Sequence, residues 1–390
     1  MSDVYVLDWV RTPRGKASAK GGLHPLSALD LVTGLQSALA QRTGLDPERL
    51  QDVVIGVASQ TGEQGADLAR TANLLSGWPT PGVTLNRFCA SGIDAVATTA
   101  ARIRAGDYSL AVAGGVESVS RVPIFSDGGA LWSDPAVVDA VGSVHMGIAA
   151  DLNATREGFT RDELDSYALE THQKAAAAWE SGAFDRSVVR LNELERDELI
   201  RPGIDAVALA SLPPAFADRP DDDALVLKRY DAIDHVHTVG TSPQMADGAA
   251  LLLLGTEAEA DRLGLAPRAR VISSATATCD PVLMLTAGQE AMEGAIARAG
   301  LTPTDIDVFE FAEAFSALCL RFRRDLDAGP DRMNPNGGTM AMGHAFGATG
   351  AIMVGGAIDE LERRAGRYAV AGVSGAAGLG VGVVLERMEA

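Results

Sequence analysis

Two short segments of this chain occur twice, in the same order and at almost the same spacing. Residues 44–53 (GLDPERLQDV) are echoed by residues 300–308 (GLTPTDIDV), and residues 110–114 (LAVAG) by residues 368–372 (YAVAG). The offsets are 256 and 258 residues, so we infer two homologous halves. Predicted strands and helices alternate around both copies, which favours an α/β fold whose sites lie on turns at the strand ends.

The stretch between the repeats differs from them, because residues 121–239 are richer in charge and proline. A capping box at Thr160 and Glu163 predicts one clear helix there, and residues 219–223 are expected to form a surface loop with three solvated aspartates. We interpret residues 121–239 as a domain inserted into the first half. The N-terminal half then comprises residues 1–120 and 240–268, and the C-terminal half residues 269–390.

The composition of the chain excludes some classes of binding partner and indicates a cellular compartment. The net charge of −19 argues against a nucleic-acid or anionic-membrane surface. The three cysteines lack metal-ligand spacing, which favours no metal site and a reducing cytoplasm. No apolar run is long enough for a membrane span, and we expect no signal peptide and no peroxisomal address.

A cysteine lies where a predicted strand gives way to a predicted helix, in residues 85–92 (LNRFCASG). Apolar residues recur at helical spacing after Cys89, and Gly106 is placed as a C-cap. The free N–H groups and dipole of the helix N-terminus would favour a thiolate, so Cys89 is a candidate nucleophile. On this stretch alone, a buried structural cysteine is the alternative.

Four further turns contain candidate residues. His344 lies in a glycine-rich loop and is either a base for a thiol or a surface residue, and Glu313 is either a helix-start acid or an anchor. Residues 373–380 (VSGAAGLG) are suited either to holding an oxyanion through N–H groups or to a tight hairpin. Residues 240–249 are expected to form a turn before a helix.

Together, these segments resemble the thiolase family over nearly the whole chain. The resemblance is carried by the Cys-Ala-Ser-Gly turn at Cys89, by residues 113–118 (AGGVES), by residues 247–249 (DGA), and by the His344 loop in its Asn-Gly-Gly context. It implies two βαβαβαββ halves in a five-layered αβαβα sandwich with an inserted loop domain. It also implies a homodimer or homotetramer that takes acyl-CoA and CoA as substrates and needs no cofactor.

The resemblance assigns roles residue by residue. Cys89 would carry the acyl group, and His344 would activate it and help to hold a thioester oxygen. The N–H of Cys89 and one from the Ala376 turn would hold the other oxygen. Ser242 resembles a serine that contacts pantetheine, and Met146 a methionine of the acyl pocket.

Four residues, in three motifs, depart from the family pattern. Ala312 stands where the family has the Asn of Asn-Glu-Ala-Phe, and Ala345 where it has the Pro of Gly-His-Pro. Ser374 and Ala376 replace the Cys and Gly of a Cys-x-Gly turn, whose cysteine is the family's base for the second acyl-CoA. A serine hydroxyl is a far weaker acid than a thiol, and general acid–base catalysis contributes about 10²–10⁴-fold.

The leading hypothesis is therefore a thiolase-like acyltransferase that thiolyses or condenses β-ketoacyl-CoA through Cys89. One alternative is a diverged condensing enzyme with a non-standard acceptor, and another is a CoA-ester-binding paralogue with weak turnover. Lys228 and Arg229 are either contacts for the CoA phosphates or ordinary surface charges.

Overall fold

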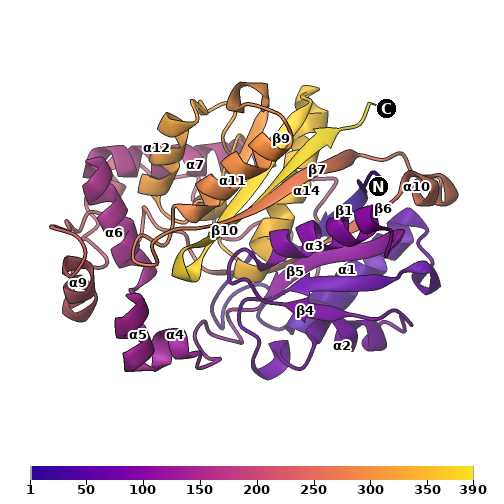
Figure 1. Ribbon diagram of the computed structural model, residues 1–390, viewed down its shortest axis with the longest axis horizontal. Coiled ribbons are helices and arrows are strands. Elements are labelled where there is room, and N and C mark those ends of the chain that lie inside the picture. Colours follow the sequence, from indigo (N-terminus) through magenta and orange to yellow (C-terminus); the bar gives the residue numbers. More distant parts are fainter. Residues whose placement is uncertain (1, 390) are drawn as a thin grey trace.

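The computed structural model describes residues 2–389, and the two halves lie side by side in it (Figure 1). The strands of the N-terminal half are β1 (Tyr5–Arg11), β2 (Gly15–Lys16), β3 (Asp52–Gly56), β4 (Val83–Leu85), β5 (Leu110–Glu117) and β6 (Ala246–Gly255). Those of the C-terminal half are β7 (Ala269–Thr278), β8 (Val308–Phe311), β9 (Tyr368–Gly375) and β10 (Leu379–Arg387).

The strand order shows the duplication. The sheet runs β4-β3-β5-β6-β1-β7-β10-β9-β8, so the order on one side of the β1–β7 junction mirrors the order on the other. Only two residue pairs join β1 to β7, Tyr5 with Arg270 and Val6 with Ala269. Within residues 2–389 the C-terminal half has no strand equivalent to β4, and one parallel bridge from Met333 to Phe309 lies in its place.

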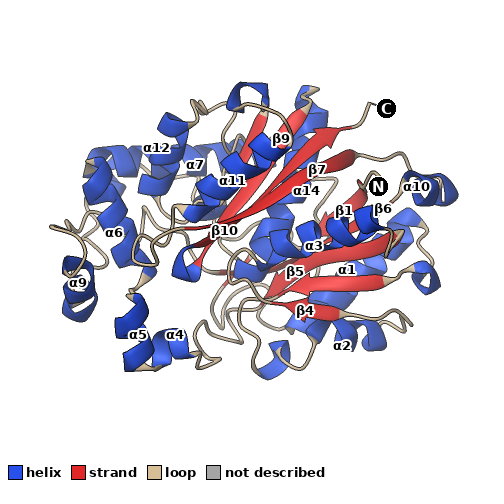
Figure 2. Cartoon of the chain, viewed as in Figure 1, coloured by secondary structure: helices blue, strands red, loops and turns tan. Residues whose placement is uncertain are grey.

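Helices cover both faces of each half-sheet, as Figure 2 shows. They are α1 (Ala28–Thr43), α2 (Leu68–Leu75), α3 (Ser91–Ala105), α10 (Glu257–Leu263), α11 (Ala287–Arg298), α12 (Ser316–Asp325), α13 (Thr339–Met342) and α14 (Phe346–Arg364). Short 3₁₀ turns occur at η1 (Pro47–Arg49), η2 (Gly62–Gln64), η3 (Pro303–Asp305) and η4 (Ala376–Gly378). Residues 44–53 and 300–308 thus each form a 3₁₀ turn that leads into a strand, and residues 110–114 and 368–372 each lie in a strand.

The predicted five layers are present. Helices α3 and α14 pack against each other between the half-sheets, α1 and α2 cover the outer face of the first, and α11 covers that of the second. The central crossing is tight: a Cβ at Gly92 would lie 2.4 Å from the Gly347 carbonyl oxygen, and one at Gly350 would lie 2.7 Å from the Ile93 nitrogen. Only glycine permits so close a backbone approach.

The stretch between β5 and β6 forms a group of helices at one end of the molecule (Figure 1). They are α4 (Ala130–Ser133), α5 (Pro135–Val141), α6 (Met146–Glu157), α7 (Arg161–Glu180), α8 (Ala206–Ala210) and α9 (Pro220–Leu227). The capping box at Thr160 and Glu163 begins α7, as predicted. No helix in residues 2–389 is long and apolar enough to cross a membrane.

Two local predictions are wrong. The aspartates of residues 221–223 form the first turn of α9 and not a loop, because acidic side chains suit a helix N-terminus. Two of them also have partners, since Asp222 accepts from the His145 backbone N–H and Asp223 contacts the His235 ring. Residues 246–255 are strand β6 and not a helix, because a strand buried on both faces has no periodicity to reveal it.

Candidate active site

One cavity of about 450 Å³ brings residues from both halves and from the inserted helices together. Its lining includes the predicted residues Cys89, Met146, Ser242, His344 and Ser374. Most of the remaining wall is apolar, and it consists of Ala17, Ile124, Leu199, Phe216, Val239, Pro243, Met245, Leu285, Ala312, Ala314, Phe315, Phe346 and Gly375, with Lys16, His145 and Gln244 as its other polar members.

Cys89 lies two residues before α3, at the position expected from the sequence. The turn is fixed by the Ser91 hydroxyl, which accepts from the Arg87 N–H at 2.8 Å and donates to the Phe88 carbonyl at 2.6 Å. Phe88 adopts a left-handed conformation with φ of 50°, a strained state for a non-glycine residue. The turn therefore holds the thiol at the cavity wall with only 7% of the residue exposed.

The expected thiolate is the part of this prediction that the structure contradicts. Burial, followed by the nearby Glu117 carboxylate, raises the pKa of Cys89 to about 12, and a backbone N–H lowers it less than these two raise it. Desolvation of the charged form outweighs the helix N-terminus. Cys89 is thus held as a neutral thiol.

His344 lies two residues before α14, on the opposite half. Its backbone N–H donates to the Gln244 carbonyl at 2.7 Å, and its Nδ1 lies 2.9 Å from the Thr349 hydroxyl. Burial, and secondarily the positive charge of Arg14, lower the pKa of His344 to about 4. The ring is therefore a neutral imidazole whose Nε2 is left for the cavity.

Glu313 lies outside the cavity lining and holds the loop that precedes His344. Its carboxylate is fully buried and accepts from the hydroxyls of Tyr167 and Thr171, the Asn334 amide and the Met340 N–H, at 2.7–3.0 Å. Since α12 begins only at Ser316 and these donors lie on other elements, the helix-start interpretation is wrong. Glu313 is an anchor that fixes α13 and, through it, the position of His344.

Ser374 is the penultimate residue of β9, and its hydroxyl both donates and accepts a hydrogen bond. Its hydroxyl donates to the Leu285 carbonyl at 2.7 Å and accepts from the Gly288 N–H, in the first turn of α11, at 3.0 Å. The N-cap residue of that helix, Thr286, makes no capping hydrogen bond. Ser374 therefore caps α11 from a neighbouring strand.

The turn after Ser374 is both a hairpin and part of the site. Strands β9 and β10 pair from Gly375 with Leu379, so the hairpin alternative holds. Ala376 lines a smaller pocket together with Cys89, Phe88 and Met146. The hairpin alternative is therefore confirmed, and the holding of an oxyanion by this turn stays a prediction.

The remaining predicted residues are placed unequally. The Ser242 hydroxyl lines the cavity and donates to the Thr238 carbonyl at 2.7 Å, and Met146 begins α6. Arg229 pairs with Asp280 at 3.1 Å and Lys228 with Asp139, both on the exposed surface. The surface-charge alternative therefore describes these two residues.

Sequence reasoning missed two residues near the reacting groups. His145 lines the cavity, and its Nδ1 accepts from the Gly147 N–H at 3.1 Å as the N-cap of α6. Glu117, at the end of β5, accepts from the backbone N–H groups of Ala58, Ser59 and Gly347 at 2.9–3.1 Å, which joins the two halves. A histidine directly before an apolar helix could have indicated His145 as a helix cap. Glu117 lies within residues 113–118, which carry the family resemblance, but nothing in that segment indicates which backbone groups its carboxylate contacts.

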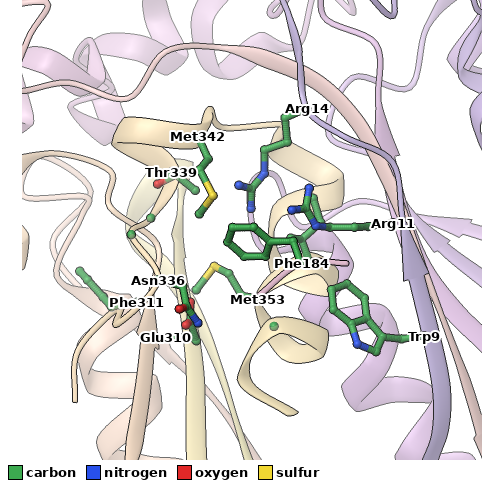
Figure 3. Close-up of a pocket in the computed structure, with 14 residues that line it drawn as sticks. Trp9, Arg11, Arg14, Phe184, Glu310, Phe311, Asn336, Thr339, Met342 and Met353 are labelled. Carbon is green, nitrogen blue, oxygen red and sulfur yellow. The ribbon is translucent and has the colours of Figure 1, made fainter. Parts of the chain in front are cut away.

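A smaller cavity of about 30 Å³ lies behind the His344 loop, and Figure 3 shows its side chains. Arg14 and Glu310 line it, with Met342 and Met353 between them (Figure 3). Burial lowers the pKa of Arg14 to about 10, and burial with the nearby Glu360 raises the pKa of Glu310 to about 8. No sequence-predicted site residue lines this cavity.

Comparison with known proteins gives the family. The thiolase N-terminal domain family matches residues 4–258, and the thiolase C-terminal domain family matches residues 265–387. The chain belongs to the thiolase family. Thiolases are acyltransferases, so this chain belongs to a family of acyl-transfer enzymes.

Individual thiolases match over the full length. A 3-ketoacyl-CoA thiolase of Colwellia psychrerythraea is 35% identical, and a 3-oxoadipyl-CoA/3-oxo-5,6-dehydrosuberyl-CoA thiolase of Escherichia coli is 34% identical, each match covering 100% of both chains. The crystal structure of the Bacillus anthracis acetyl-CoA acetyltransferase superposes with a TM-score of 0.86 at 30% identity, covering 100% of this chain and 99% of that one.

Proposed function

We propose that this thiolase transfers acyl groups between CoA thioesters through Cys89, in the thiolysis or Claisen condensation of β-ketoacyl-CoA. The observation that supports this most is the meeting of Cys89 and His344, one from each half, in a single cavity. The apolar walls and the few polar groups are typical of a site for a small-molecule thioester.

The neutral state of both groups sets how acylation proceeds. With pKa values of about 12 for Cys89 and about 4 for His344, a thiolate–imidazolium pair is strongly disfavoured. We infer that the thiol attacks the thioester carbonyl while its proton passes to Nε2 of His344, with Nδ1–H donating to Thr349. The carbonyl becomes an oxyanion, which the N–H groups of Cys89 and Ala376 would hold. The proton then goes to the departing CoA sulfur.

The same proposal assigns the other residues of the site. Ser242 and Met146 would contact pantetheine and the acyl chain, and Glu313 and Ser374 would act by positioning, without contact to the reacting atoms. Coenzyme A thioesters would be the only ligands needed. No group of three or more metal-ligating side chains with suitable placement occurs among residues 2–389.

Organisation and compartment are part of the proposal. The inserted domain would span residues 121–239, supported by its six helices between β5 and β6. The protein would be a homodimer or homotetramer, supported by Leu74, Leu75 and Val83, which are 43–66% exposed beside the edge strand β4. Its three free cysteines favour a reducing cytoplasm.

Intact-mass analysis after incubation with acetyl-CoA tests the proposal. We expect one acetyl group per chain, mapped to the Cys89 peptide, and none in Cys89→Ala. Cys279→Ser is the matched control, because Cys279 is partly exposed and lies outside the cavity lining. Acetylation that persists in Cys89→Ala, or full turnover of acetoacetyl-CoA with CoA by that variant, would contradict the proposal.

One observation favours a second candidate, a protein that holds CoA esters without turnover. The Ser374 hydroxyl, at the place of the family's second base, is engaged with Leu285 and Gly288. Rapid stoichiometric acylation of Cys89 followed by multiple turnovers would exclude this candidate.

A further inference from the structure

Which molecule can accept the acyl group from Cys89, in the second half of the reaction, depends on the bases that line the cavity. Condensation needs a carbon nucleophile, and taking a proton from the α-carbon of an acyl-CoA needs a strong, well-placed base. Ser374 does not supply one, because its only proton is held by the Leu285 carbonyl and a lone pair is occupied by the Gly288 N–H.

The other titratable groups of the cavity cannot take a proton from the α-carbon either, each for a different reason. Among residues 2–389, its lining contains Cys89, His344, His145 and Lys16. Cys89 carries the acyl group. His344 has its Nδ1 engaged with Thr349 and a pKa lowered to about 4, so it is too weak a base for an α-carbon, which is a far weaker acid than the thiol it serves in acylation. Lys16 is exposed at the cavity wall, and a lysine side chain supplies hydrogen-bond donors and no acceptor.

His145 is fixed as a hydrogen-bond donor. Its Nδ1 accepts from the Gly147 N–H, so in the neutral ring the proton lies on Nε2. Burial and the nearby Arg219 lower its pKa, so the ring is neutral at pH 7. The cavity therefore offers N–H donors for an enolate oxygen but no free base for an α-carbon.

We propose that the acceptor is a 2-carboxyacyl thioester of the malonyl type, whose carbon nucleophile arises by loss of CO₂. This inference rests on the proposed acylation of Cys89 and names the second substrate of the same site. The apolar wall supports it, because an acceptor carboxylate taken out of water is costly and CO₂ is neutral.

The step balances without a base. The bond between the α-carbon and the carboxylate carbon breaks, CO₂ leaves, and the electron pair forms the enolate of the thioester. The enolate carbon attacks the acyl carbonyl, a carbon–carbon bond forms, and the bond from that carbonyl to the Cys89 sulfur breaks. The sulfur takes up one proton through His344, which is the proton the overall reaction consumes. The products are β-ketoacyl-CoA, CO₂ and CoA.

The test uses the full-length protein with acetyl-CoA and carboxyl-labelled malonyl-CoA. Labelled CO₂ and acetoacetyl-CoA are measured together, and a parallel reaction contains acetyl-CoA alone. We expect CO₂ and acetoacetyl-CoA in a ratio of one, at least tenfold faster than self-condensation of acetyl-CoA, and neither product with Cys89→Ala.

A second variant makes the test independent of absolute activity. Ser374→Cys should raise self-condensation of acetyl-CoA relative to CO₂ release, because it adds a thiol where the serine is now engaged, and circular dichroism checks that it folds. The wild-type ratio remains decisive if this variant does not fold.

The outcomes separate this inference from the proposed function. Acetylation of Cys89 without CO₂ release above the Cys89→Ala background overturns the inference alone. Self-condensation as fast as the malonyl reaction, or CO₂ release without acetoacetyl-CoA, also overturns it. Absence of Cys89 acetylation overturns the proposed function and the inference with it.

Discussion

The turn before α3 and the turn before α14 are the same place in the two halves of the molecule. Cys89 lies two residues before the first of these helices and His344 two residues before the second, and the helices pack against each other in the central layer. Duplication thus placed two equivalent turns face to face. One difference is the side chain, a thiol in the first turn and an imidazole in the second.

The two turns differ in how they are held. In the N-terminal half, β4 ends at Leu85 and α3 begins at Ser91, and Ser91 itself fixes the short turn. In the C-terminal half, a single bridge at Met333 stands in the place of β4. The longer loop from there to Phe346 is fixed by Glu313. A short turn is ordered by its own residues, whereas a long one needs an external anchor.

The largest effect is expected from removing the side chain that distinguishes the second turn. His344→Ala should slow acylation of Cys89 by about 10²–10⁴-fold, because proton transfer loses its acceptor. Rapid-quench mass spectrometry measures the rate, and His24→Ala, at a histidine outside the cavity lining, is the control. A loss of less than tenfold would assign the base to another group.

The pH dependence of stability should separate the two turns. The His344 imidazole titrates near 6.5 when unfolded but has a pKa of about 4 when folded, so stability is lost as the pH falls from 6.5 toward 4. The Cys89 thiol titrates near 9.0 unfolded and at about 12 folded, so stability is lost as the pH rises above 9. The free energy of unfolding should fall by about 2–4 kcal/mol in each range, the acid arm below pH 6.5 and the alkaline arm above pH 9.

Urea unfolding across pH measures both arms. His344→Asn should flatten the acid arm in part, since buried His172 has a similarly low pKa of about 4. Cys89→Ala should likewise flatten the alkaline arm in part, since burial also raises the pKa of Cys319 and Tyr167. An alkaline arm unchanged in Cys89→Ala would show that the thiol is not buried as described.

A smaller effect is expected from loosening the anchor of the second turn. Glu313→Gln should lower the free energy of unfolding by about 2–3 kcal/mol, because an amide replaces an acceptor that faces four donors. Glu310→Gln, three residues earlier and without such donors, is the matched control and should change stability little at pH 7. Equal losses in the two variants would refute the anchor role.

The smallest effect should come from the serine that caps α11. Ser374→Ala removes one capping hydrogen bond and should cost about 1 kcal/mol of stability, measured as a shift of the urea midpoint at unchanged slope. Thr286→Ala, at the formal N-cap that makes no capping bond, should cost less. The reverse order would mean that Ser374 does not cap the helix.

Several features of the fold and the site could be predicted from the sequence, because repeated segments and turn-forming or capping residues can be recognised without knowing the packing. The duplication, the helix after Cys89 and the capping box at Thr160 were correctly predicted. Strand β6 was not, because a fully buried run has no alternation to read. The protonation of Cys89 was also missed, since burial by distant segments and the charge of Glu117 are invisible in the local pattern.

The glycine crossing of α3 and α14 makes the reacting pair sensitive to changes remote from substrate. The half-sheets share only two residue pairs at β1–β7, so the helix contact must set how far apart the sulfur and the imidazole stand. A single methyl at Gly92 or Gly350 would act as a wedge between the halves. Variants selected for altered reactivity should therefore accumulate in this helix pair as readily as in the cavity wall.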